Sequence, residues 1–217
     1  ENPLPFIGNH LLSSSSGSSM EIKVVPTKPI DGQKPGTSGL RKKTKIFMGE
    51  HYLENFVQSV FNAVASSGQS LKGATLCVSG DGRYHNKTAA QTIIKMAAAA
   101  GVSRVWCGTD GLLSTPAMSA VIRERDPAGG PKPIGGFILS ASHNPGGIDE
   151  DFGIKYNGAN GGPAPEGVTN AIYDITTKIA EYSLCPGVPD IDLTKAGTHS
   201  LGTEDAPFEV SVFSCVE

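Results

Sequence analysis

The stretch Ile134–Gly147 reads IGGFILSASHNPGG and joins an apolar run to a polar turn. The apolar part, which ends at Leu139, has the length and the flanking glycines of a buried strand. Pro145 and the two glycines that follow it force a tight turn and let a ligand or another backbone segment approach closely. Ser142 lies between the strand and the turn, where its hydroxyl can project into a cleft while the sheet holds its backbone. This position makes Ser142 the first candidate for a functional residue.

The segments on either side of this stretch alternate between short apolar strands and helical patterns. The pattern predicts strands over 21–25, 44–47, 75–78, 105–107, 134–139 and 208–213, and helices over 52–65, 88–100, 115–123 and 165–180. Strands and helices that alternate in steps of about 25–30 residues are typical of an α/β layered domain with crossover connections. Ligands of such domains gather beyond the carboxyl ends of strands, which selects the loops after Val78 and Leu139.

His143 is the neighbour of Ser142 and could in principle act as its base. On extended backbone, adjacent side chains point to opposite faces, so we expect that His143 is not the direct base for the Ser142 hydroxyl. This argues against a protease-like pair of serine and histidine. His143 could still act on a substrate or orient a phosphate, and an isolated S-H-N-P sequence is also compatible with an ordinary turn that carries a solvated histidine.

Lys155 is a second candidate, in the segment DFGIKYN at Asp151–Asn157. If Ile154 and Tyr156 share one face of an extended strand, Lys155 points to the other face. A return strand over these residues would bring the Lys155 ammonium near the Ser142 loop. There it could stabilise the charge of a phosphate or, with a lowered pKa, move a proton. Taken alone, a lysine on a half-buried strand is usually a solvated residue.

A third candidate is the segment KPGTSGLRKK at Lys34–Lys43. Its glycine-rich turn carries the hydroxyls of Thr37 and Ser38, and three consecutive cations begin at Arg41. Backbone N–H groups and an arginine fork suit a phosphate dianion, although the order of residues is not that of a P-loop. Gly80–Arg83, which reads GDGR, is a weaker candidate. We expect an ordinary turn there, and its sequence gives little reason to place it in the same cleft.

Composition excludes several broad classes of function. The chain has 18 basic and 21 acidic residues and a net charge of −3, which argues against general binding to nucleic acid. No stretch approaches the ~20 apolar residues that are needed to span a bilayer. Four cysteines lie far apart without a C-x-x-C pair, which favours scattered free thiols over a zinc site.

The first residues have the composition of a flexible extension. Residues 1–19 end in a run of serine and glycine, and they lack the basic and apolar regions of a secretory signal. We expect this segment to be a disordered leader or an artificial addition, with Met20 as the natural start. The remaining residues, 20–217, are expected to form one domain.

Five segments together resemble the phosphoglucomutase branch of the α-D-phosphohexomutase superfamily. They are KPGTSGLRKK, GDGR, ASHNPGG, DFGIKY and NGGPAPE, and they occur in the family order with family-like spacing over nearly all of residues 20–217. The resemblance implies the first domain of such an enzyme, which is a layered mixed sheet sandwiched by helices. It also implies an isomerase of cytoplasmic carbohydrate metabolism. The implied reaction interconverts glucose 1-phosphate and glucose 6-phosphate through a phosphoserine enzyme, with glucose 1,6-bisphosphate as activator and intermediate.

The resemblance further implies roles for individual residues. Ser142 matches the family's phosphoserine, which also provides an oxygen to Mg²⁺. Lys155 matches a residue implicated in proton transfer, His143 one implicated in proton transfer or orientation, and Arg41 one that contacts the phosphorylated centre. These four are the implied catalytic residues. The implied substrate-binding residues are Thr37, Ser38, Arg41, Ser142, His143 and Lys155.

The chain departs from the family in what it lacks. Members of the family have four domains, of which the second supplies a D-x-D-x-D-R metal loop, the third a G-E-E-S-type sugar loop and the fourth a phosphate-binding loop. None of these motifs occurs here, and the acidic run Asp149–Asp151 is contiguous. We therefore expect weak binding of Mg²⁺ and little or no mutase activity from this chain alone. Its expected partners are hexose phosphates and domains 2–4 of the mutase.

Two other interpretations remain open at this point. The first is a parafusin-like phosphoprotein that acts as a binding partner in regulated secretion, with phosphorylation of Ser142 as a signal. The second is a phosphomannomutase or phosphoglucosamine mutase domain, which shares the same chemistry. The NGGPAPE segment favours the glucose branch, but the sugar loop that decides between substrates is not in this chain.

Overall fold

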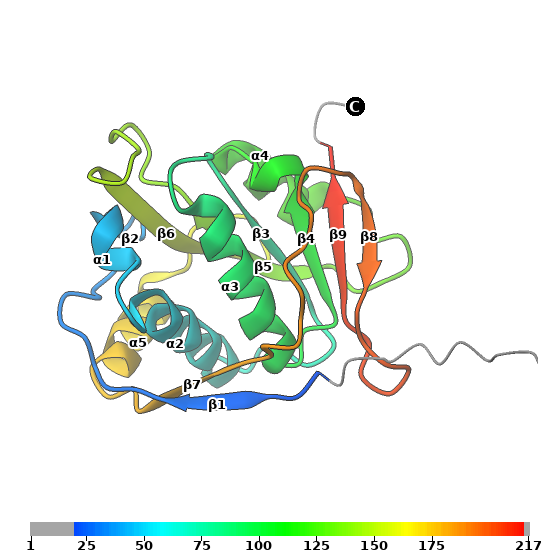
Figure 1. The fold of residues 1–217 in the computed structure, drawn as a ribbon, viewed down its shortest axis with the longest axis horizontal. Helices are drawn as coiled ribbons and strands as arrows, with labels where there is room; N and C mark the ends of the chain where they lie inside the picture. The colour runs from blue at the N-terminus through cyan, green and yellow to red at the C-terminus, as the bar shows by residue number, and fades with distance from the viewer. Residues whose placement is uncertain (1–19, 215–217) are drawn as a thin grey trace, which may run out of the picture.

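The structure is a computed structural model that describes residues 20–214. The expectation for residues 1–19 lies outside this range. In chain order the elements are β1 (Lys23–Pro26), β2 (Leu40–Lys43), α1 (Thr44–Phe47), α2 (Tyr52–Ser66), β3 (Thr75–Gly80), α3 (Asn86–Ala99), β4 (Arg104–Gly108), a 3-10 turn η1 (Thr109–Gly111), α4 (Thr115–Glu124), β5 (Pro133–Leu139), β6 (Asp151–Gly158), α5 (Glu166–Thr176), β7 (Glu181–Leu184), β8 (Gly197–Ser200) and β9 (Glu209–Phe213). Figure 1 shows how they are arranged.

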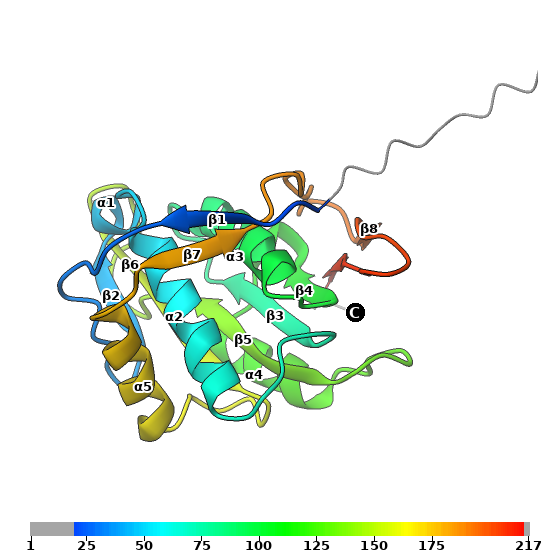
Figure 2. The same ribbon diagram turned by 90° about the horizontal axis from the view of Figure 1, so that it is seen from below.

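The main sheet has seven strands in the order β2-β6-β5-β3-β4-β9-β8. The central strands β5, β3, β4 and β9 are parallel, whereas β6, β2 and β8 join their neighbours in antiparallel pairs. Helices α2 and α3 lie over one face, and α4 packs on β3 and β5 from the other. A second, two-stranded sheet of β1 and β7 packs on α2 and α3 (Figure 2). These layers confirm the predicted mixed sheet sandwiched by helices.

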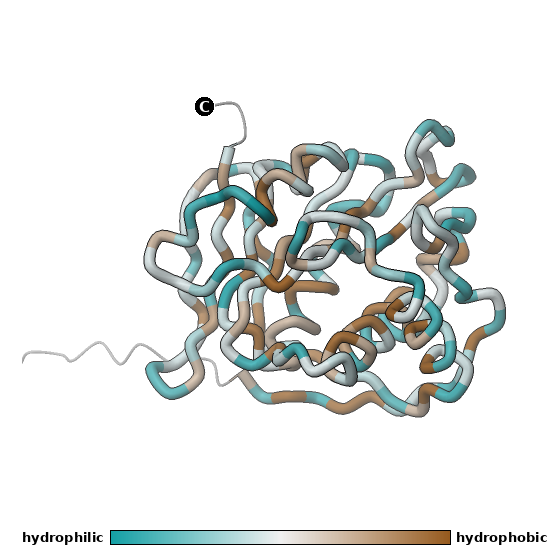
Figure 3. The backbone as a smooth tube through the Cα atoms, turned by 180° about the vertical axis from the view of Figure 1, so that it is seen from behind, coloured by the Kyte–Doolittle hydropathy of each residue, from teal (hydrophilic) through white to brown (hydrophobic). Residues whose placement is uncertain are grey.

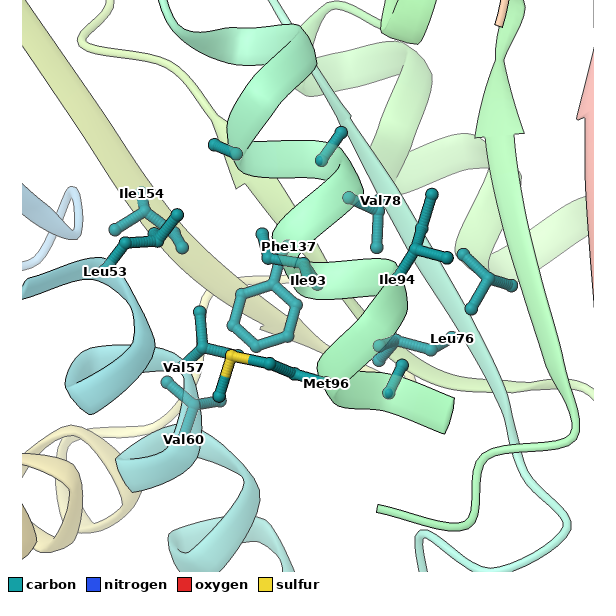
Figure 4. Close-up of a cluster of buried hydrophobic side chains, with 14 of the residues drawn as sticks. Leu53, Val57, Val60, Leu76, Val78, Ile93, Ile94, Met96, Phe137 and Ile154 are labelled. Carbon is teal, nitrogen blue, oxygen red and sulfur yellow. The ribbon is translucent and has the colours of Figure 1, made fainter. Parts of the chain in front are cut away.

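The larger hydrophobic core lies between the sheet and helices α2 and α3. Val57 and Val60 of α2 point toward Met96 of α3 and Phe137 of β5 (Figure 4). All four residues are fully buried. The apolar residues at helical spacing in α2 therefore form the face of the helix that packs on the core. Hydrophilic residues predominate in the peripheral loops (Figure 3). No helix within residues 20–214 is long and apolar enough to cross a membrane.

Three local predictions differ from the structure. Residues 44–47 form helix α1 instead of a strand, because Thr44 and Phe47 are buried one helical turn apart and Ile46 is exposed. The strand that pairs with β6 is β2, formed by residues that the sequence assigned to a phosphate-binding turn. The helix expected over 165–180 ends at Thr176, and β7 and β8 were not predicted.

The pairing of β3 with β5 brings two loops to the same edge of the sheet. The strands are parallel, and their last residues, Gly80 and Leu139, are register partners. The backbone N–H of Asp81 and Nδ2 of Asn86 both donate to the Leu139 carbonyl oxygen, each at 3.1 Å. The structure thus confirms that the loops after the strands at 75–78 and 134–139 meet, as the rule for carboxyl ends predicts.

Strand β6 is the return strand that the sequence predicts. It runs antiparallel to β5, with Lys155 opposite Ile138, and antiparallel to β2, with Arg41 opposite Gly153. Ile154 faces the larger core, so the alternation of side chains places Lys155 on the opposite face of the sheet. Arg41 lies on that same face, because its neighbour Leu40 is also part of the larger core.

Gly153 is the point at which the loop after β5 crosses β6. A Cβ at this position would overlap the Ser140 carbonyl oxygen and would lie 3.2 Å from the Ala141 Cα. We expect Gly153→Ala to lower the free energy of unfolding by about 2–3 kcal/mol, because the backbone must move to admit a methyl group. Denaturant unfolding followed by circular dichroism measures the change. The control is Gly167→Ala in α5, where a Cβ meets nothing within 4 Å; it should stabilise the protein by about 0.5 kcal/mol. Equal effects of the two substitutions would contradict the prediction.

Candidate functional site

Ser142 occupies a turn directly after β5. Its φ of 55° lies in the left-handed region, which non-glycine residues rarely adopt. The Ser142 N–H donates to Ser140 Oγ at 3.0 Å, and the Asn144 N–H donates to the Ala141 carbonyl oxygen at 3.2 Å. The turn is therefore closed by its own hydrogen bonds and lies at the upper left of Figure 1, between β5 and β6.

This conformation corrects one step of the sequence argument. We expected extended backbone at Ser142, from which opposite directions for Ser142 and His143 followed. The backbone is left-handed instead, so strand alternation does not fix the direction of the His143 side chain. His143 is exposed and forms no hydrogen bond or ion pair with the described residues. Its role in proton transfer or orientation stays a prediction.

Arg41 of β2 contacts the candidate nucleophile. Its Nη2 donates to Ser142 Oγ at 2.6 Å, across 101 positions of sequence. Its Nε is buried and has no hydrogen-bond partner within the described part of the chain. A buried N–H without a partner is costly, so this donor is available to an anion that enters beside Ser142.

Lys155 lies beside Arg41 on the same face of the sheet. Burial lowers the pKa of the Lys155 ammonium, and the positive charge of Arg41 lowers it further. Neither cation forms an ion pair with a carboxylate among residues 20–214. Two neighbouring cations without a counter-charge create a site that favours anions. The structure therefore brings Lys155 to Arg41, and through Arg41 to Ser142, but shows no direct hydrogen bond from Lys155 to Ser142.

Thr37 and Ser38 form the tip of a tight turn against β6. Gly36 and Gly39 exchange two backbone hydrogen bonds of 3.0 Å on either side of this tip. Gly39 has a φ of 90°, and a Cβ there would overlap the backbone of β6 next to Lys155. Thr37 and Ser38 are exposed, and Thr37 lines a small pocket together with Lys155. The turn thus reaches the site, and binding of substrate by its hydroxyls stays a prediction.

Arg83 belongs to the site more firmly than the sequence suggested. Its side chain is only 6% exposed, and its guanidinium donates to the Ser142 carbonyl oxygen at 3.2 Å. The sequence treated the GDGR segment as a weak candidate because the four residues read as an ordinary turn. The signal that could have identified Arg83 is its place after β3, at the same edge as Ser142.

The acidic residues near Ser142 pair with lysines. Lys43 Nζ lies 3.1 Å from Asp151 Oδ1 and 3.5 Å from Glu150 Oε2, and Lys45 pairs with Asp149. Within residues 20–214 no group of three or more His, Cys, Asp or Glu side chains could hold a metal ion. The buried cysteines of this range are free, as expected.

Comparison with known sequences identifies relatives of this arrangement. A family model described as phosphoglucomutase/phosphomannomutase, alpha/beta/alpha domain I, matches residues 32–183. Cytoplasmic phosphoglucomutases of Pisum sativum and Solanum tuberosum are both 60% identical, over 192 and 193 residues. These matches cover 88% and 89% of this chain but 33% of each relative. The chain thus spans about a third of the length of the curated relatives that it matches.

Solved structures include a similar fold. The exocytosis-sensitive phosphoprotein parafusin of Paramecium, which is also named as a phosphoglucomutase, is 47% identical with a TM-score of 0.83. The match covers 90% of this chain and 35% of that protein. A Thermus thermophilus protein described as a phosphomannomutase has 19% identity and a TM-score of 0.55, over 88% of this chain and 34% of its own, which shows likeness of fold alone.

The strain at Ser142 can be tested by two substitutions that both remove its hydroxyl. Glycine adopts a positive φ without penalty, whereas alanine does not. We expect Ser142→Gly to be more stable than Ser142→Ala by about 1 kcal/mol in free energy of unfolding. Thermal and urea unfolding of the two variants measure this difference. Equal stabilities would show that the left-handed conformation is not maintained in solution.

The environment of Lys155 predicts a dependence of stability on pH. The folded state lowers the pKa of this ammonium below its usual 10.5, so the unfolded state binds more protons between the two values, and stability rises with pH across that interval. Lys155→Met removes the disfavoured charge. Because the side chain is partly exposed, we expect a gain in melting temperature of only about 1–2 °C at pH 7, and the charge-dependent part of this gain should disappear near pH 10.5. Calorimetry at both pH values measures it, and a gain that grows with pH would refute it.

Proposed function

Because the chain belongs to the phosphoglucomutase/phosphomannomutase family and contains its domain I, we propose that Ser142 carries a phosphoryl group between glucose 1-phosphate and glucose 6-phosphate. The observation that supports this most directly is the 2.6 Å hydrogen bond from Arg41 Nη2 to Ser142 Oγ. A serine hydroxyl bonded to a cation that keeps a second free donor is suited to carry a phosphate dianion.

The proposed chemistry is a transfer in two directions. Ser142 Oγ attacks one phosphorus of glucose 1,6-bisphosphate, a new O–P bond forms, and the bond from that phosphorus to the sugar oxygen breaks. The hydroxyl proton of Ser142 leaves, and the sugar oxygen takes up a proton. When the 1-phosphate is the group removed, glucose 6-phosphate is released. In the second transfer the free 6-hydroxyl of glucose 1-phosphate loses its proton and attacks the phosphorus on Ser142, the bond from that phosphorus to Ser142 Oγ breaks, Oγ takes up a proton, and glucose 1,6-bisphosphate is formed again. Arg41 and Lys155 balance charge on the phosphoryl oxygens, which is the main requirement of this reaction.

Lys155 and His143 are the proposed groups for moving protons. The lowered pKa of Lys155 makes its neutral form easier to reach than that of a solvated lysine, which suits a group that gives and takes protons. His143 is exposed beside the nucleophile, where it can meet a sugar hydroxyl. Thr37 and Ser38, at the tip of their turn, complete the proposed set of substrate-binding residues.

Glucose phosphates are the proposed substrates because the relatives at 60% identity are named phosphoglucomutases. Likeness to a phosphomannomutase rests on 19% identity and supports the fold alone. The alternative of a secretory phosphoprotein does not compete with this proposal, since the Paramecium relative bears both names. A cytoplasmic location is likewise proposed from the names of the plant relatives.

The remaining two-thirds of the relatives' length supplies what this chain does not show. We propose that residues 20–217 act as the first domain of a mutase. Its other domains would bind the sugar and provide most of the ligands of the Mg²⁺ ion. In this chain only phosphorylated Ser142 would contribute an oxygen to that ion. The nearby carboxylates of Asp149 and Asp151 pair with lysines.

Incubation with glucose 1,6-bisphosphate and Mg²⁺ tests the phosphoryl carrier. We expect intact mass spectrometry to find one added phosphate, localised to Ser142 by fragmentation, and no added phosphate in Ser142→Ala. Coupled assays should show little mutase turnover by this chain alone. A phosphate on Ser38 or Ser140 would count against the assignment, and turnover like that of a complete mutase would refute the need for further domains.

A further inference from the structure

The loop that carries Ser142 is held from inside by one arginine. Arg83 Nη1 donates to the carbonyl oxygens of Asp151 at 2.7 Å and Asn144 at 3.3 Å, and Nη2 donates to that of Ser142 at 3.2 Å. The carbonyls of Ser142 and Asn144 belong to the connection from β5 to β6, and that of Asp151 belongs to the first residue of β6. A single planar group therefore fixes the spacing between two points of this connection and the start of β6.

Asp81 holds the arginine in place. Its carboxylate accepts from Arg83 Nε at 2.9 Å and from Nη2 at 2.7 Å, in the bidentate manner that suits a guanidinium. Burial alone would raise the pKa of Asp81, but the hydrogen bonds and the positive charge of Arg83 hold it below its usual value. The carboxylate therefore stays ionised and paired at neutral pH.

Both backbone polar groups of Ser142 are bound to this arrangement. Its N–H donates to Ser140 Oγ, and its carbonyl oxygen accepts from Arg83. The left-handed conformation of Ser142 is thus held at both of its peptide groups, by the side chain of Ser140 and by that of Arg83, which Asp81 fixes in turn. We call Asp81 and Arg83 together the Asp81–Arg83 clamp.

Arg83 is not available to bind phosphate itself. A guanidinium has five N–H groups, and those of Arg83 are directed to Asp81, Asn144, Asp151 and Ser142. Arg41 differs, because its Nε is buried without a partner among the described residues. The two arginines near Ser142 therefore have different partners. Arg41 binds the Ser142 hydroxyl, and Arg83 binds the Ser142 backbone carbonyl.

Gly146 shows that the loop is shaped around Arg83. A Cβ on Gly146 would lie 2.8 Å from the Arg83 Cβ and 3.6 Å from its Cα, so a larger residue would push the turn away from the arginine. The glycine that the sequence associated with close approach of a ligand or backbone thus accommodates an arginine of the same domain.

We propose that the Asp81–Arg83 clamp positions Ser142 for phosphoryl transfer by fixing the backbone from which its hydroxyl projects. Both are positioning residues, since neither contacts Ser142 Oγ. The proposal rests on the proposed function of Ser142 and adds that the rate of transfer depends on two residues outside the substrate-binding set. Displacement of a reacting group by about 1 Å can lower a rate about 100-fold.

The test compares Arg83→Gln and Asp81→Asn with a matched control, Arg104→Gln. Arg104 is also a partly buried arginine, and it joins the carboxylate of Glu209 to the backbone carbonyl of Pro127. It lies at the start of β4, at the opposite edge of the sheet from Ser142. Glucose 1,6-bisphosphate is the phosphoryl donor, and the rate of phosphate uptake at Ser142 is followed by mass spectrometry over a range of donor concentrations. Melting temperature and hydrogen exchange of the Ser142, Asn144 and Asp151 amides are measured on the same samples.

We expect both clamp variants to lower the maximal rate of uptake about 10–100-fold. The donor concentration for half-maximal rate should change less than about twofold, because Arg41 and Lys155 are untouched. Exchange of the three loop amides should become at least about tenfold faster. Arg104→Gln should lower the melting temperature by a similar amount but leave the rate and the loop exchange unchanged.

Other outcomes separate the two proposals. Equal losses of rate in Arg83→Gln and Arg104→Gln would show that Arg83 acts only through general stability and would overturn the clamp. Unchanged loop exchange in both clamp variants would also overturn it. If the wild-type chain takes up no phosphate at Ser142, the proposed function fails, and the exchange data still decide whether Asp81 and Arg83 hold the turn.

Discussion

The carbonyl oxygen of Leu139 accepts hydrogen bonds from the Asp81 N–H and from Asn86 Nδ2, and the backbone of Gly80 lies so close that no Cβ fits there. One atom at the end of β5 therefore connects the loop after β3 and the start of α3. Because this contact closes the edge of the parallel strands, Asp81 reaches the residues that follow Leu139. The position of the candidate nucleophile follows from that packing, since Ser142 lies only three residues further along the chain.

The charges of the site are arranged for a ligand more than for the stability of the free protein. Lys43, Lys45 and Lys87 pair with carboxylates at the surface, whereas Arg41 and Lys155 have no carboxylate partner among the described residues. Burial and mutual repulsion disfavour two adjacent charges of the same sign. An anion beside Ser142 would relieve both costs, so the arrangement has a physical explanation if a phosphate occupies it during the reaction.

The sequence predicted the layers of the fold, because strand and helix patterns depend on local periodicity, and it predicted the return strand that places Lys155 on the same face of the sheet as Arg41. The catalytic roles of Ser142, His143, Lys155 and Arg41 stay predictions. The sequence did not predict the left-handed turn at Ser142, which depends on hydrogen bonds with Ser140, two residues away, and with Arg83, 59 residues away. The periodicity of a sequence does not encode either of these contacts. The sequence pattern misassigned residues 44–47, since a segment of only four residues is too short for its pattern to distinguish a helical turn from a strand. The importance of Arg83 was hidden for a related reason, because a tertiary hydrogen bond to a carbonyl leaves no mark on the composition of a turn.

Two sets of interactions fasten the loop around Ser142, and their magnitudes differ. On the outside, Lys45 and Asp149 are 65% and 70% exposed, and such pairs contribute about 0–1 kcal/mol each. On the inside, the Arg83 side chain is 6% exposed and donates to three carbonyls, where hydrogen bonds to a charged group contribute about 1.5–3 kcal/mol. Strain at a left-handed residue costs about 1–2 kcal/mol. The outer pairs alone barely offset that strain, so the inner contacts decide the conformation of Ser142.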